Sequence, residues 1–106
     1  KQQVLQSCTK DACLVPMDIV RYCYKGISYH TVLLEKGTPL AVSDVGVGVE
    51  FLRSAIISGW MNICINTKTI EDPLFIGTIE KGIKPLVVDG VKKCTVMSRA
   101  VLNKLQ

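Results

Sequence analysis

The sequence is poor in the residues that build most metal-binding sites. His30 is the only histidine, and the five cysteines include no Cys-x-x-Cys pair. Structural zinc needs four convergent cysteine or histidine ligands, usually in close pairs. The nearest approach to such a set is Cys8, Cys13, Cys23 and His30. Its spacing is unlike that of a zinc site, so we expect no bound metal.

The odd number of cysteines also bears on the cellular compartment. They are Cys8, Cys13, Cys23, Cys64 and Cys94. At least one thiol has to stay free, which favours a reducing environment. We therefore expect a cytoplasmic location, which would be the host cytoplasm for a viral protein.

Recognisable catalytic motifs are missing as well. The sequence contains no phosphate-binding loop and no serine-centred nucleophile elbow, and Gly46-x-Gly48 lacks the third glycine of a dinucleotide-binding loop. The adjacent acids Glu71-Asp72 precede a proline, where turn formation and solvation explain them. A dyad of Cys23 and His30 is an alternative, but no nucleophile motif surrounds it. We predict a non-enzymatic protein without a cofactor.

No segment has the length and apolarity of a membrane span. The longest uncharged stretch, 54–67, includes Asn62 and Asn66 and is shorter than the roughly 20 apolar residues that a spanning helix needs. The first residues lead into no apolar signal region. The sequence thus argues against a membrane span and against secretion.

The abundant residues favour β-structure. Hydrophobic residues make up 48% of the chain, and the many valines and isoleucines are types enriched in strands. Asp89-Gly90 between two apolar runs is a typical hairpin turn, and Lys25-Gly26 also suggests a turn. The predicted strands are 17–24, 27–34, 40–43, 61–66, 74–80, 83–88 and 91–94.

The resulting fold class is α+β and mainly β. We predict a small antiparallel sheet or barrel of about six to seven strands within one domain, 1–106, whose residues 1–16 form an irregular arm. A C-terminal helix is predicted near 98–105. The segment 49–60 is ambiguous, but its apolar residues recur at nearly helical spacing, which favours a central helix.

The net charge of +4 is concentrated near the C-terminus. Residues 81–106 contain six basic residues and one acidic residue, a balance of +5, whereas residues 1–80 contain seven basic and eight acidic residues, a balance of −1. Such asymmetry is compatible with binding to single-stranded RNA, in which lysines and arginines neutralise phosphates and aromatic side chains stack on bases. The candidate residues are Lys84, Lys92, Lys93, Arg99, Tyr22 and Tyr24. A basic face that is merely solvated is the alternative.

Two Leu-Gln pairs suggest proteolytic processing. They are Leu5-Gln6, followed by Ser7, and Leu105-Gln106. Viral chymotrypsin-like proteases that read glutamine cleave after such pairs, so cleavage is predicted at Gln106. Coincidence is the alternative explanation for two such pairs.

The order of these features resembles the small RNA-binding replicase protein, non-structural protein nine, of coronaviruses and related nidoviruses. The similar stretches are Ser7-Cys8 with Ala12-Cys13, the segment 63–73 that leads into 83–88, and the closing 96–106. The Asn-Asn start of that family is absent, and so is the glycine motif of its last helix. The resemblance implies a small β-barrel that binds RNA and pairs with itself or with other replicase proteins.

The leading prediction is therefore a non-enzymatic viral replicase-type domain that binds single-stranded RNA through a basic C-terminal hairpin and helix. The alternative is a protein-interaction or self-assembly module without nucleic-acid binding. The apolar composition and the outer face of the C-terminal helix favour that alternative.

Overall fold

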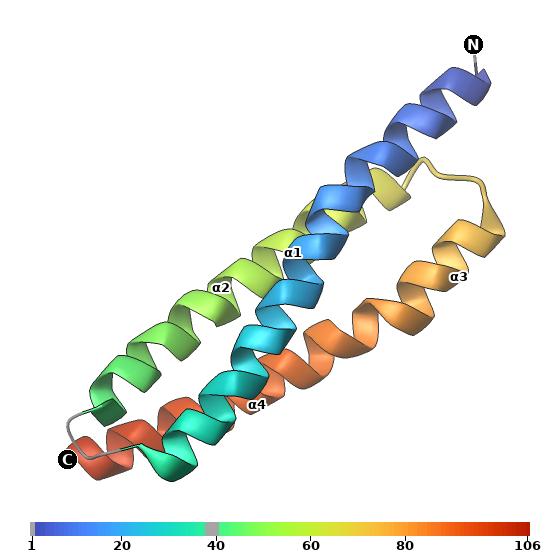
Figure 1. Cartoon of the computed structure of the whole chain (residues 1–106). Helices are drawn as coiled ribbons and strands as arrows, with labels where there is room; N and C mark the ends of the chain where they lie inside the picture. The colour runs from blue at the N-terminus through green and yellow to red at the C-terminus, as the bar shows by residue number, and fades with distance from the viewer. Residues whose placement is uncertain (1, 38–40) are drawn as a thin grey trace.

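The protein is an elongated bundle of helices. The computed structural model describes residues 2–37 and 41–106. Within these residues lie α1 (Gln2–Lys36), α2 (Val42–Thr67), α3 (Pro73–Gly82) and α4 (Lys84–Leu105). The molecule measures 57 × 18 × 18 Å. Figure 1 shows α1 and α2 running antiparallel, with α3 and α4 forming a broken third rod that returns the chain along both.

The predicted mainly-β fold is wrong, because the described residues contain four helices and no strand. Residues 17–24 and 27–34 lie in α1, 61–66 in α2, 74–80 in α3 and 91–94 in α4, while 83–88 spans the α3–α4 junction. Leu40, the start of the predicted strand 40–43, lies outside the described residues. The arm predicted as irregular is helical from Gln2 onward.

The physical reason lies in the spacing of the buried side chains. In α4 they recur every three or four residues, at Val87, Gly90, Cys94, Met97 and Val101. This is the 3.6-residue period of a helix with one face in the core. Strand propensity is a weak preference that such packing overrides. The segments 49–60 and 98–105 lie within α2 and α4, and both helices are longer than the predicted ones.

The pairs Lys25-Gly26 and Asp89-Gly90, which were predicted to form turns, also reflect helix packing. Both glycines lie inside helices, and no described glycine has positive φ. A Cβ at Gly90 would lie 3.0 Å from Ile56 Cδ1 and 3.2 Å from Ile27 Cδ1. The missing side chain therefore serves the close approach of helices rather than a turn.

One apolar core joins the three rods. Its fully buried members include Ile27 of α1, Ile56 and Ile63 of α2 and Ile79 of α3. No buried residue in the described part of the chain is polar or charged. None of the described helices combines the length and the apolarity that crossing a membrane would require.

Candidate functional site

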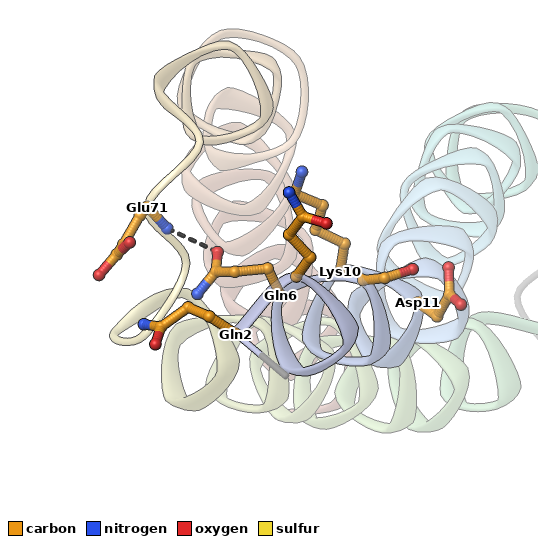
Figure 2. Close-up of a pocket in the computed structure, with 7 residues that line it drawn as sticks. Gln2, Gln6, Lys10, Asp11 and Glu71 are labelled. Atoms are coloured by element: carbon orange, nitrogen blue, oxygen red, sulfur yellow. Dashed lines mark hydrogen bonds between the residues drawn. The ribbon is translucent and has the colours of Figure 1, made fainter.

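A polar recess lies where the first turns of α1 meet the loop between α2 and α3. Its volume is about 440 Å³. Figure 2 shows Gln2, Gln6, Lys10 and Asp11 along α1, with the backbone of Glu71 beside Gln6 and the Glu71 carboxylate directed away from α1. The lining residues, called the polar recess from here on, are Gln2, Gln3, Gln6, Ser7, Lys10, Asp11 and Glu71.

Helical spacing gathers these side chains on one face. Gln2, Gln6 and Lys10 stand four residues apart in α1, so they follow one another along the same side of the helix. Gln6 then fastens α1 to the loop, because its Nε2 donates to the carbonyl oxygen of Thr69 at 2.6 Å. Its Oε1 accepts from the backbone N–H of Glu71 at 2.9 Å, as Figure 2 shows.

An ion pair joins one lining residue of the polar recess to the start of α3. Lys10 Nζ lies 2.8 Å from Asp72 Oδ2. The other carboxylate oxygen, Oδ1, caps α3 by accepting from the backbone N–H groups of Leu74 and Phe75 at 3.0 and 3.3 Å. The hydrogen bond from Lys10, followed by that from Phe75, lowers the pKa of the Asp72 carboxyl. Asp72 is therefore ionised at neutral pH and ties the start of α3 to α1.

The polar recess brings acid–base and amide groups together at an open surface. The carboxylates of Asp11 and Glu71 are exposed and can accept a proton or a hydrogen bond. In the described part of the chain no three histidine, cysteine, aspartate or glutamate side chains lie close enough to hold a metal ion. The arrangement suits binding of a polar organic molecule and proton transfer to or from it.

Sequence reasoning missed the polar recess. Turn formation and solvation account for Glu71-Asp72 in the sequence, so this pair alone does not indicate a site. The available signal was the four-residue spacing of Gln2, Gln6 and Lys10, which becomes informative only once residues 2–36 are recognised as a helix.

A second polar cluster links α1 to α4. The Tyr24 hydroxyl donates to Asp89 Oδ2 at 2.5 Å and accepts from Lys93 Nζ at 3.0 Å. Lys93 Nζ also lies 3.1 Å from Asp89 Oδ2 and 4.9 Å from the centroid of the Tyr24 ring. We call these three residues the Tyr24 cluster.

The charges of the Tyr24 cluster stabilise one another. The hydrogen bond from Tyr24, and then that from Lys93, lowers the pKa of Asp89. The hydrogen bonds with Tyr24 and Asp89 raise the pKa of Lys93. Both groups are thus held in their charged forms, which is the behaviour of a structural ion pair rather than of an acid–base catalyst poised near neutrality.

The other residues predicted to bind RNA are dispersed. Lys84 Nζ lies 3.5 Å from Glu80 Oε2, and Lys92 and Arg99 are exposed on α4. Tyr22 is exposed on α1, with Lys25 Nζ 5.7 Å from its ring centroid. Of the six residues predicted to bind RNA, only Tyr24 and Lys93 contact each other, through a hydrogen bond and a cation–π contact. The basic residues share one helix instead of the predicted hairpin.

The two Leu-Gln pairs lie in different surroundings. Leu5-Gln6 is inside α1, where a protease could bind it only after the helix unwinds. Gln106 follows α4, and its backbone N–H donates to the Leu102 carbonyl oxygen at 3.1 Å. Cleavage at Gln106 stays a prediction.

The three buried thiols show no sign of activation. Burial raises the pKa of Cys13 and of Cys23, and it is the largest cause of the rise of the Cys94 pKa to about 11. Cys23 and His30 are seven residues apart in α1, which is about 10 Å along the helix axis. His30 Nδ1 instead lies 2.7 Å from the Gly26 carbonyl oxygen. A Cys23–His30 dyad is therefore absent.

Comparison with known proteins gives a family match. The model of the formiminotransferase-cyclodeaminase family matches residues 1–85. A methenyltetrahydrofolate cyclohydrolase of Methylorubrum extorquens is 28% identical over 85 residues, which cover 80% of this chain and 41% of the relative. The chain thus spans less than half the length of this curated relative. No solved structure matches the chain.

These findings overturn the functional predictions. The resemblance to the coronavirus replicase protein is wrong, because the matched family is one of folate-related enzymes. The predictions of an RNA-binding viral domain and of a non-enzymatic interaction module are wrong for the same reason. All residues that line the polar recess lie within the matched segment 1–85.

Proposed function

The chain belongs to the formiminotransferase-cyclodeaminase family, and from this membership we propose that it forms part of a folate-dependent enzyme of the cyclohydrolase or cyclodeaminase type. The match of the family model over residues 1–85 is the observation that carries the proposal. The relative named as a methenyltetrahydrofolate cyclohydrolase supports the first of the two reaction types. We therefore take hydrolysis of a folate ring as the reaction.

The polar recess is the proposed folate-binding site. Its seven lining residues all fall inside the matched segment. The larger groove between α2 and α4 is lined in part by residues 98–105, which lie beyond that segment. A function shared across the family is therefore better supported for the recess than for the groove.

The chemistry of the recess fits a hydrolytic ring opening. In such a reaction the oxygen of water bonds to the ring carbon, the carbon–nitrogen bond breaks, and the nitrogen takes up a proton. A carboxylate near the water serves as the general base. Asp11 has this role in our proposal, because α1 gives it a more rigid support than the loop gives Glu71. The amides of Gln2 and Gln3 bond to polar atoms of the ring, and Lys10 faces a folate carboxylate.

The test uses methenyltetrahydrofolate with the full chain. We expect binding by isothermal titration and a faster loss of the near-ultraviolet absorbance of the substrate than in buffer. Asp11→Asn should retain binding and lower the hydrolysis rate by roughly 100-fold, the usual contribution of a general base. Asp18→Asn is the matched control, because Asp18 is an exposed carboxylate of α1 outside the recess, paired with Arg21. Absence of both binding and turnover would refute the proposal.

We also propose a cytoplasmic location. All five cysteines are free in the structure, and three of them are buried with raised thiol pKa values. Protonated, buried thiols persist most readily in a reducing compartment. Fractionation of the source cells should recover the chain in the cytoplasmic fraction with its thiols unmodified, and recovery with disulfides from another compartment would contradict this.

A further inference from the structure

The short helix α3 is held less firmly in the bundle than the other helices. All of its ten residues are described, and among them Ile79 alone is buried. Five residues of α4 are buried, whereas Leu74 in the first turn of α3 is 84% exposed. Most of the stability of a helix in a protein comes from packing of its apolar face. Among these helices, α3 therefore detaches from the core at the lowest cost.

A break in the third rod lets α3 move relative to α4. Ile83 separates the two helices, with φ −110° and ψ −51°, and its side chain is fully buried. Pro85 follows at the start of α4. A proline has no backbone N–H, and its ring clashes with the carbonyl oxygen four residues earlier in a continuous helix. Figure 1 shows α3 extending past this break toward the loop that leads back to α2, so Ile83 is placed to act as a pivot.

Two side chains of α1 hold the far end of α3. Gln6 forms hydrogen bonds with the backbone of Thr69 and Glu71 in the preceding loop. Lys10 pairs with Asp72, the N-cap of α3. We call Gln6 and Lys10 the latch. They stand four residues apart, so a single face of α1 supplies all of these contacts.

The latch lies at the surface and can break without unfolding of the bundle. The side chains of Lys10 and Asp72 are 31% and 36% exposed, and an ion pair open to solvent adds little stability. The hydrogen bonds of Gln6 are exposed as well, so water can replace them when they open. Opening also uncovers Ile70 and Ile79, which are buried in the closed form, and the closed form therefore predominates.

We propose that α3 and residues 69–72 form a lid on the polar recess, which the latch holds shut and which opens by rotation about Ile83. Glu71 belongs to this lid and lines the recess, so part of the recess wall moves with α3. The other six lining residues belong to α1, whose buried side is part of the core. Opening thus gives a ligand access to groups that stay in place, and closing excludes water around the bound ligand.

The lid and the folate site are tested separately. The role of the lid at a binding site rests on the proposed function, but its motion needs no ligand. The opening is local, so it is compatible with cooperative unfolding of the whole bundle. Exchange measurements without folate therefore decide on the lid, and titration with folate decides on the proposed function.

Hydrogen exchange of the full native chain, measured by mass spectrometry, tests the latch. In the wild type, the amides of α3 should exchange faster than those of α2. Gln6→Leu removes both hydrogen bonds to the loop and should speed exchange in 73–82 about tenfold, with exchange in α2 unchanged. Gln3→Leu is the matched control and should leave this exchange unchanged, since Gln3 is exposed on the same helix and the bonds to the loop come from Gln6.

Two results would overturn the lid. One is exchange of α3 in the wild type that is as slow as that of the buried part of α2. The other is a response to Gln6→Leu that is absent, or that is equal in all four helices, because an equal increase reports a general loss of stability.

A variant at the break tests the pivot. Pro85→Ala restores a backbone N–H and removes the ring that prevents a continuous helix. Pro85 is exposed, so the loss of its ring leaves the core contacts intact. Exchange in 73–82 should slow several-fold, which is opposite to the effect of Gln6→Leu. Unchanged or faster exchange in Pro85→Ala would contradict rotation about Ile83.

Discussion

Single side chains tie the rods of this protein together across long sequence separations. Tyr24 and Asp89 are 65 residues apart and meet through a hydrogen bond between α1 and α4. Gln6 and Lys10 do the same between α1 and the loop before α3. Tyr24 and Lys93 were predicted to bind RNA, and Asp72 was predicted to lie in a solvated turn. In the structure these polar side chains hold one helix against another.

The Tyr24 cluster makes stability depend on pH in a defined direction. The pKa of Asp89 is lowered in the folded protein, so the charged carboxylate adds stability that is present above the unfolded pKa and is lost as the pH falls through the folded pKa. Asp89→Asn should therefore reduce the free energy of unfolding most at pH 7. The difference from wild type should shrink once the pH falls below the usual Asp value of 3.8.

Urea unfolding at pH 7 and pH 3, followed by circular dichroism, measures this difference. Asp18→Asn is the control, because the Asp18 carboxylate pairs with Arg21 within α1 and links no second helix. An Asp89→Asn effect that is as large at pH 3 as at pH 7 would show that its charge is not the cause.

At the scale of the element, glycine has two different meanings in these helices. Gly77 lies inside α3, and nothing comes within 4 Å of where its Cβ would be. Gly90 lies inside α4, with Ile56 and Ile27 against the corresponding position. The first glycine costs helix stability without a packing role, and the second makes room for a neighbouring rod.

Substitutions at the two positions should therefore have opposite effects. Gly77→Ala should raise the free energy of unfolding by about 0.5–1 kcal/mol, because alanine loses less backbone entropy in a helix. Gly90→Val should lower it by about 1–3 kcal/mol, because the added carbons overpack the contact with Ile56 and Ile27. Chemical denaturation of both variants measures the two signs, and stabilisation by Gly90→Val would contradict the close contact.

At the scale of the whole molecule, the narrow rod still has one continuous core. Buried residues from α1, α2, α3 and α4 belong to a single cluster, although the molecule is 57 Å long and only 18 Å wide. The prediction that residues 1–106 form a single domain stays a prediction. We propose on this basis that the four helices unfold together.

A single domain of this size should unfold in one step. Helix content by circular dichroism and the fluorescence of Trp60, the only tryptophan, should report coincident transitions in urea. Because Trp60 packs against the core within α2, its signal reports the tertiary contacts of the rods. Two separated transitions would show that one end of the rod unfolds independently.

Part of the fold was accessible from the sequence, and part was misread. The helical spacing at 49–60 and the helix near 98–105 were visible, because apolar periodicity survives without any tertiary information. The valine- and isoleucine-rich segments and the Asp89-Gly90 pair favoured strands, because local propensity carries no information about packing. The polar recess was not predicted, since Gln6 and Glu71 come together only after α1 and α2 pack side by side.

By itself, the sequence determined the helical spacing at 49–60, the concentration of basic charge in 81–106 and the absence of a long apolar run. These are properties of single residues and of local spacing, so they need no fold. The tertiary structure alone decided that Gly90 serves a helix contact, that Tyr24 meets Asp89 and Lys93, and that Phe51 of α2 stays exposed. Each of these depends on which helix faces meet. The packing of all the helices around one core decides this, and no single segment carries that information.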